Sequence, residues 1–311
     1  MTTSRTTTAT ATPRCLAADE EEWILSAIYR REVRSYFCGM TGAIFMAFIL
    51  CMTGIYMTVY NLMGGYPNFE VALSGMAFVF LIAVPVLTMR SFSEEKHART
   101  DQLLYALPLS MTAVVMAKFL AMVTVLAIPV GVMCLYPLLL ATFGTVSLGS
   151  AYGAILAFFL LGCALVSIGM FLSSLTESQV IAAVLGVAAM LFCYLMNGIA
   201  GLIPTTAAAS FVAFLLLACA VGLIVQAVTK NTTAALTVTA VLVFGIAGLY
   251  FWKSELFAGT FPKLLQSLAL FDRLSDFTNG IFDLTAIVYY LSVCGLFCFL
   301  TVQSMEKKRF A

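Results

Sequence analysis

The stretch "YGAILAFFLLGCALVSIGMFLS" (152–173) sets the character of this chain. It holds no lysine, arginine, aspartate or glutamate, and its side chains are almost all apolar or small. A helix that crosses the hydrocarbon core of a bilayer needs about 20 predominantly apolar residues. Residues 152–173 therefore predict a membrane-spanning helix.

The same pattern recurs along the whole chain. Of its 311 residues, 62% are hydrophobic and only 10% are charged, and the mean hydropathy is +1.03. Soluble domains carry about 25% charged residues, so composition excludes that class. We expect an all-α polytopic membrane protein with about eight spans, at 39–60, 70–89, 113–140, 152–173, 179–199, 206–228, 233–251 and 284–303.

Two parts of this pattern are irregular. The third span is long enough to be tilted, or to be broken near Pro129 and Pro137, because proline cannot continue an α-helical hydrogen-bond ladder. The segments 179–199 and 206–228 are joined by "AGLIPT", which fits either a short external turn or a re-entrant bend. Their apolar length favours two crossings.

The basic residues predict the orientation. With eight spans, both termini lie on one side, and all 16 lysines and arginines except Lys253, Lys263 and Arg273 fall on or near that side. Cytoplasmic loops are enriched in lysine and arginine, so we expect a multi-pass membrane protein with both termini in the cytoplasm. The net charge of +1 gives no indication of a nucleic-acid partner.

The N-terminal region divides into two segments before the transmembrane domain at 38–311. Residues 1–18 read as a disordered cytoplasmic tail. Residues 19–37 read as an interfacial amphipathic helix that touches membrane lipid. Its apolar side holds Ile24, Leu25, Ile28, Tyr29, Val33 and Tyr36, and its basic side holds Arg30, Arg31 and Arg34. Glu32 falls on the apolar side, which leaves open whether it faces lipid or protein.

Several chemistries are disfavoured by what the sequence lacks. No G-x-x-x-x-G-K-[ST] phosphate loop occurs, so ATP and Mg would have to be bound by a partner. The nine cysteines form no C-x-x-C pair, and we expect no metal site and no catalytic residues. No lysine, arginine, aspartate or glutamate lies deep within an expected span, which argues against an ion-coupled carrier.

The loop "RSFSEEKHARTDQLLYALPLS" (90–110) is the densest mixed-charge segment. Its "EEKHAR" fits the E-E-x-x-x-R pattern of intramembrane proteases, but His97 is the only histidine, and such enzymes need others. Ser91 and Glu94 are spaced like a helix capping box, and Thr100 could cap a second short helix with a leucine edge. From the residues alone, a solvated turn and a docking surface remain equal alternatives.

The resemblance of this segment to a known protein family favours the docking surface over the solvated turn. Residues 85–121 resemble the permeases of ABC-2 type transporters, in particular the gliding-motility-associated subgroup, through "TDQLL", "PLS" and Lys118. Residues 267–310 and "YRREVRSYF" (29–37) are similar to the ends of the same subgroup. Where that pattern commonly has glycine before the threonine, this chain has Arg99. The segment 200–250 appends two spans to a six-span family core.

The resemblance implies a function and a set of sites. It implies a permease subunit of an ATP-driven exporter, without ATPase activity. Its partners would be cytoplasmic ABC ATPase subunits, a second identical or related permease subunit, and an extracytoplasmic auxiliary protein. The alternative is a non-transport scaffold whose ATPase remodels another protein. The coupling loop is 90–112, with contacts from Glu94, Glu95, Lys96, Arg99, Thr100, Asp101, Leu103 and Leu104, and "SSLTESQ" (173–179) is a second contact.

The remaining candidate residues lie in the interfacial helix and the external loop. The helix contributes Arg30, Arg31, Glu32 and Arg34. The loop 252–283 is expected to include an amphipathic helix that either contacts substrate or an auxiliary protein, or caps the spans. Its candidate residues are Asp272, Arg273, Asp276, Phe277 and Gly280.

Overall fold

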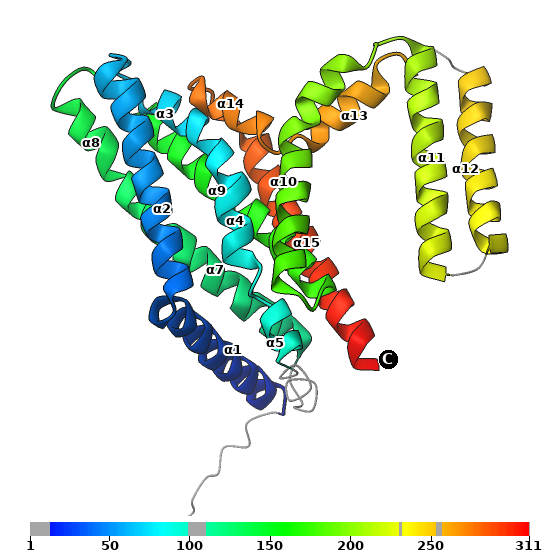
Figure 1. The fold of residues 1–311 in the computed structure, drawn as a ribbon, viewed down its shortest axis with the longest axis horizontal. Coiled ribbons are helices and arrows are strands. Elements are labelled where there is room, and N and C mark those ends of the chain that lie inside the picture. Colours follow the sequence, from blue (N-terminus) through cyan, green and yellow to red (C-terminus); the bar gives the residue numbers. More distant parts are fainter. Residues whose placement is uncertain (1–12, 99–109, 230–231, 253–256, 311) are drawn as a thin grey trace, which may run out of the picture. The chain divides into compact units, whose positions relative to one another are not determined.

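The computed structural model describes residues 13–98, 110–229, 232–252 and 257–310, and over these ranges the chain is helical without strands (Figure 1). Six of its helices are long and apolar enough to cross a membrane: Met40–Met63, Phe69–His97, Met111–Ala141, Leu148–Leu175, Gln179–Leu202 and Leu284–Lys307. The predicted all-α polytopic fold is confirmed.

The chain forms two compact units. The first comprises Met1–Met190 and Leu274–Ala311, and the second comprises Leu191–Arg273. The first unit contains α1 (Pro13–Cys38), α2 (Met40–Tyr56), the π-helix η1 (Met57–Met63), α3 (Phe69–Met76), the 3₁₀ turn η2 (Ala77–Val79), α4 (Phe80–Thr88), α5 (Ser93–His97), α7 (Met111–Met133), α8 (Leu135–Ala141), α9 (Leu148–Leu175) and α15 (Leu284–Phe310).

Helix α9 is the centre of the first unit. It packs against α3, α4, α7 and α15, and most of its apolar window is buried. Small residues permit this close approach, since a Cβ on Gly162 would lie only 2.7 Å from a methyl carbon of Leu126. Phe158 stacks on Phe80 of α4, with 4.2 Å between ring centroids. The stretch that predicts a span is thus the core of this unit.

The third expected span is broken, as Pro129 and Pro137 predict. Helix α7 ends at Met133 and α8 begins at Leu135. Pro137 has no N–H to donate to the carbonyl four residues earlier, at Met133, and its ring would crowd that carbonyl. The break therefore falls one turn before Pro137, while Pro129 is accommodated inside α7.

The N-terminal helix begins at Pro13, earlier than the expected start at 19, and it runs alongside α7 (Figure 1). Its apolar side faces protein. Tyr36 is buried, Leu25, Ile28, Tyr29 and Val33 are half-buried, and the Tyr29 hydroxyl lies 2.9 Å from Thr124 Oγ1 of α7. Arg30 and Arg34 are exposed, as expected of the basic side.

The turn between η1 and α3 is held by a buried amide. Asn61 Nδ2 donates to the carbonyls of Tyr66 (2.8 Å) and Asn68 (2.9 Å). These bonds draw the segment containing left-handed Gly65 (φ 69°) back against the π-helix. Glu70, in the first turn of α3, is 1% exposed. The turn therefore buries a carboxylate at the beginning of the second span.

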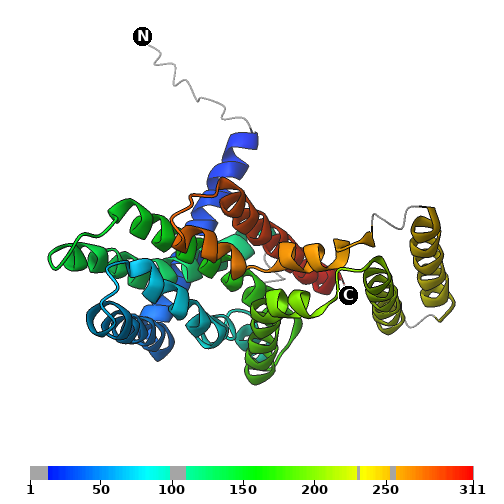
Figure 2. The same ribbon diagram turned by 90° about the horizontal axis from the view of Figure 1, so that it is seen from above.

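The second unit contains the end of α10 (Gln179–Leu202), together with α11 (Ala207–Thr229), α12 (Thr232–Trp252) and α13 (Thr260–Leu268). Helices α11 and α12 lie side by side in both views (Figures 1 and 2), and Gly222 of α11 packs directly against Thr239 of α12. Their apolar segments, Ala207–Leu223 and Leu236–Gly248, are shorter than those of the six span-capable helices. Whether this pair crosses the membrane stays a prediction.

The external loop contains the amphipathic helix that the sequence predicts. In α13, Phe261, Pro262 and Leu265 are buried, whereas Lys263 and Gln266 are exposed. Phe261 and Leu265 pack with Met196 and Ala200 of α10 in one apolar cluster. This packing gives α13 a structural role within the second unit. The short helix α14 (Asp272–Thr278) follows it.

Candidate functional site

The α5 end of the first unit brings together four elements: α1, the turn between α4 and α5, α7 and the C-terminal end of α9. The backbone N–H groups of Phe92 and Ser93 each donate to Ser173 Oγ of α9 at 3.2 Å. Ser173 in turn donates to the Met89 carbonyl at 3.2 Å. The predicted capping box is wrong, because α5 begins at Ser93 with Phe92 as its N-cap residue and no capping side chain of its own. A hydroxyl from a distant helix satisfies these N–H groups instead.

A lysine makes the second attachment to α9. The ammonium of Lys96 donates to the carbonyl of Ser174, and Lys96 is only 8% exposed. Ser174 lies in the last turn of α9, where unpaired carbonyls attract cations. Together, Ser173 and Lys96 join both the beginning and the body of α5 to the end of the central helix.

Lys118 of α7 is the buried centre of an ion-pair network. Its side chain is 2% exposed, and its ammonium lies 2.9 Å from Glu95 Oε1, 3.2 Å from Glu32 Oε1 and 2.9 Å from the Ser91 carbonyl. An ammonium has three N–H donors, so all three are used. The Phe92 ring centroid lies 5.2 Å from the same nitrogen. One lysine thus connects α1, α5 and the turn before α5.

Arg31 of α1 pairs with both carboxylates of this network from the solvent-exposed side. Its Nη2 donates to Glu32 Oε1 at 2.8 Å and to Glu95 Oε1 at 3.2 Å. Burial alone would raise the pKa of Glu32, but the charges and hydrogen bonds of Lys118 and Arg31 together lower it below its ordinary value. The hydrogen bond to Glu32 raises the pKa of Arg31. Glu32 faces protein, which settles the alternative that the sequence left open.

A second charge cluster lies across from the first. Arg90 donates from Nε and Nη2 to the two oxygens of Glu94, at 2.8 and 2.7 Å, and from Nη1 to Thr41 Oγ1 at 2.6 Å. A bidentate arginine–carboxylate pair has a fixed geometry. Since Thr41 belongs to the first turn of α2, this cluster joins the end of the second span to the beginning of the first.

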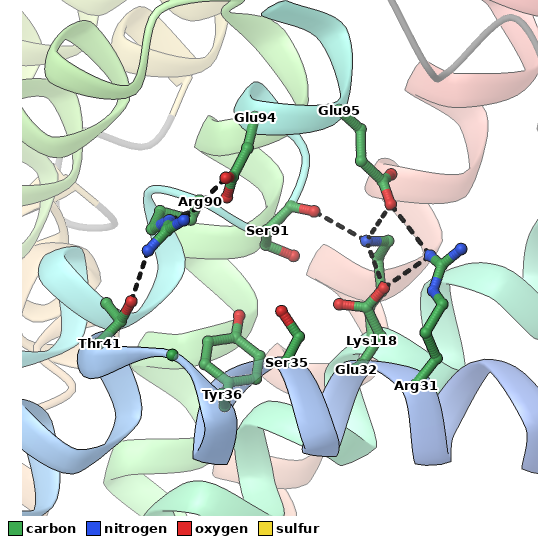
Figure 3. A pocket seen from close by; sticks show the side chains of 11 residues that line it. Arg31, Glu32, Ser35, Tyr36, Thr41, Arg90, Ser91, Glu94, Glu95 and Lys118 are labelled. Carbon is green, nitrogen blue, oxygen red and sulfur yellow. Dashed lines mark hydrogen bonds and ion pairs between the residues drawn. The ribbon is translucent and has the colours of Figure 1, made fainter. Parts of the chain in front are cut away.

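A cavity of about 340 Å³ lies between the two charge clusters (Figure 3). Ser35, Tyr36 and Ser91 line its middle, and the Tyr36 side chain is buried. Burial raises the pKa of Tyr36, so its phenol is neutral. Another cavity, of about 540 Å³, is lined by His97 of α5 and by Glu177, Ser178, Gln179 and Val180.

The structure describes only some of the predicted coupling residues. Glu94, Glu95 and Lys96 lie in or beside α5, and the structure unites Glu95 with Arg31 and Glu32 of the interfacial helix. Arg99, Thr100, Asp101, Leu103 and Leu104 lie outside the described residues, as does the expected second short helix. Residues 177–179 of the predicted second contact line a cavity with His97, so the two segments that the sequence predicts to couple are neighbours.

The candidate residues of the segment 252–283 fall in both compact units. Asp272 accepts a 2.8 Å hydrogen bond from Asn197 Nδ2 within the second unit, which links α14 to α10. Phe277 is buried in an edge-to-face contact with Phe282. Gly280, at φ 80°, lines a cavity of about 200 Å³ with Gly149, Ser150 and Gly153 of α9.

Sequence reasoning missed Lys118 as the network centre. It named Ser173 and Ser174 only as part of a candidate ATPase contact, not as attachments of α5. A signal for Lys118 was present, because it is the one lysine, arginine, aspartate or glutamate inside the expected span 113–140, and Glu32 is the acid on an apolar helix face. Two misplaced charges of opposite sign predict a pair. No comparable signal marks Ser173 or Ser174 as partners of α5. Over the described ranges, no three or more His, Cys, Asp or Glu side chains are grouped to hold a metal ion.

Comparison with known proteins agrees with the resemblance at the level of the family. Residues 8–211 match the family described as ABC-2 family transporter protein, and this range covers α1 to α10 and the beginning of α11. No curated protein and no solved structure matches the chain. Membership implies a membrane subunit without an ATPase site of its own, of a kind that generally partners with ATPase subunits. The chain belongs to the ABC-2 transporter family and is a transmembrane permease of an ABC transporter.

Proposed function

We propose that this permease is the membrane subunit of an ATP-driven exporter in the bacterial plasma membrane, with both termini in the cytoplasm. It works with a second permease subunit and with cytoplasmic ATPase subunits that bind ATP and Mg. The gliding-motility-associated subgroup is part of this proposal, supported by the "TDQLL", "PLS" and C-terminal patterns. The family match supports the broader class.

One observation carries the proposal: the segment 89–97 is fastened to three other helices. Ser173 and Lys96 fasten it to α9, and Lys118 and Glu95 fasten it to α7 and, through Glu32, to α1. A displacement of α5 by a partner would therefore move the ends of α9, α7 and α1 together. A partner can drive such a change only if its contacts differ between nucleotide states.

The same contacts assign different roles, transmission and docking, to different residues of the loop. Glu95 and Lys96 point into the bundle and serve transmission. Docking falls to the surface around the 540 Å³ cavity, where His97 at the end of α5 and Glu177 between α9 and α10 are both exposed. A side chain of the ATPase that enters this cavity would touch both segments at once.

The test uses the full-length permease reconstituted with its ATPase. Combining Lys96→Met with Ser173→Ala breaks both links to α9 and leaves the docking surface in place. We expect normal ATPase binding, but loss of the nucleotide-dependent distance change between spin labels at exposed Ile55 and Leu291. Glu177→Lys should instead weaken ATPase binding. Lys263→Met, on an exposed position of α13, is the matched control and should change neither.

Two outcomes would contradict the proposal. An unchanged distance response in the variant that combines Lys96→Met with Ser173→Ala would remove the transmission role. Nucleotide-driven movement in the wild type with no ATP-dependent loss of fluorescent lipids, apolar peptides or drugs from vesicles would favour the scaffold alternative, in which the ATPase remodels another protein.

A further inference from the structure

The 340 Å³ cavity at the α5 end is lined by charges that sum to zero. Arg31, Arg90 and Lys118 provide three cations, and Glu32, Glu94 and Glu95 provide three carboxylates. Its volume lies within the range of about 300–1,000 Å³ that small-molecule sites occupy. A simple anion would meet the carboxylates, and a simple cation would meet the basic groups. A ligand that carries both charges on a short link would satisfy both.

One buried side-chain hydroxyl at this cavity, that of Ser91, makes no hydrogen bond within the described protein. Ser91 is 5% exposed, and its Oγ is buried without a hydrogen-bond partner. Its carbonyl is already bonded to Lys118, so only the hydroxyl remains. Figure 3 shows the hydroxyls of Ser35, Tyr36 and Ser91 facing the space between the two charge clusters. A buried hydroxyl left unbonded costs roughly as much as a lost hydrogen bond, which a ligand in the cavity would recover.

The cavity lies where apolar spans begin and end. Gly39 and Thr41 flank the start of α2, and Arg90 and Ser91 follow the end of α4. Directly beside these positions, Phe37, Met40 and Ile44 expose large apolar side chains, with Met40 82% exposed. A polar cavity next to an exposed apolar surface, at the boundary of the hydrocarbon core, suits an amphiphile with a charged head.

We propose that this cavity binds the headgroup of phosphatidylethanolamine, a zwitterionic phospholipid. Its phosphate faces Arg90 and the Ser91 hydroxyl, and its ammonium donates to the carboxylates. An ammonium with N–H donors is favoured over the quaternary ammonium of phosphatidylcholine, because carboxylate oxygens accept hydrogen bonds. The acyl chains lie along the exposed apolar residues at the start of α2. Lipid binding here does not require the proposed coupling role, although both involve Glu32, Glu95 and Lys118.

The test is native mass spectrometry of the full-length protein released from nanodiscs of phosphatidylethanolamine, phosphatidylcholine or phosphatidylglycerol. We expect retention of phosphatidylethanolamine in preference to the other two lipids. Ser91→Ala should weaken that retention roughly tenfold, the effect of losing one hydrogen bond to a charged group. Ser210→Ala is the matched control, since Ser210 Oγ is also buried and unpartnered but lies in the second unit.

The stability of these variants separates a ligand site from a packing defect. In lipid-free detergent, Ser91→Ala should be at least as stable as the wild type, because it removes an unbonded hydroxyl. In phosphatidylethanolamine, it should be less stable. Equal retention of all three lipids, or unchanged retention in Ser91→Ala, would overturn the proposal. Binding of soluble phosphoethanolamine without retention of the lipid would overturn the lipid assignment.

Discussion

At each end of one span lies a buried ionisable side chain, and the two side chains differ in whether they have hydrogen-bond and ion-pair partners. The span Phe69–His97 begins beside Glu70 and ends in the turn that binds Lys118. Lys118 is 2% exposed and has two carboxylates and a carbonyl around its ammonium. Glu70 is 1% exposed, and neither of its oxygens has a hydrogen-bond partner.

This difference shows that burial alone does not determine how an ionisable side chain affects the stability of the fold. Removing one partner of a buried pair leaves the other uncompensated, which is strongly destabilising. Removing a buried group that has no partner leaves nothing uncompensated. The same substitution, to methionine, should therefore have opposite effects at the two positions.

The largest effect is expected for Lys118→Met. It leaves Glu32 and Glu95 facing each other with only the exposed Arg31 between them, so the free energy of unfolding should fall by about 3 kcal/mol. Equilibrium unfolding in lipid–detergent micelles measures this change. Lys263→Met, at an exposed position, should alter the value by less than about 0.5 kcal/mol. A similarly small loss for Lys118→Met would show that the network is not stabilising.

The next effect is expected for Ser173→Ala. It removes the acceptor for two backbone N–H groups and the donor to Met89, at a buried site, so we expect a loss of about 1–3 kcal/mol. Hydrogen exchange should show faster exchange at the Phe92 and Ser93 amides in particular. The control is Ser292→Ala, whose exposed hydroxyl bonds only within its own helix, to the Tyr289 carbonyl. Unchanged protection at both amides would contradict attachment of α5 to α9.

The sequence could predict the spans but not these attachments. Apolar runs are local, so the membrane helices, the broken third span and the amphipathic α13 follow from residue patterns. The partners of α5 are not local: Ser173 and Lys118 lie in other spans, far from residues 92–95 in sequence. The burial of Glu70 was also missed, because it depends on the turn that Asn61 holds in place.

Acidification provides a weaker test of the Lys118 end. The pKa of Glu32 is lowered in the folded protein, so its contribution to stability is fully present above its ordinary pKa of 4.5 and is lost as pH falls through the lowered value. The stability difference between wild type and Glu32→Gln should thus be constant near neutral pH and shrink below pH 4.5. In a Lys118→Met background this pH dependence should diminish, since the Lys118 charge contributes to the lowered pKa. A difference that persists unchanged at low pH in the wild-type background would refute the pairing.

The smallest effect, and the one of opposite sign, is expected for Glu70→Met. Methionine is of similar length and is flexible enough to fill the space, and the substitution removes two buried oxygens that bond to nothing. The free energy of unfolding should rise by about 1 kcal/mol, since the cost of burying an unbonded polar group disappears. Asn61→Leu is the informative companion, because it removes an amide that does have partners and should destabilise the protein. If Glu70→Met were as damaging as Lys118→Met, Glu70 would have a partner that binds only in the membrane, and the two ends of the span would be alike.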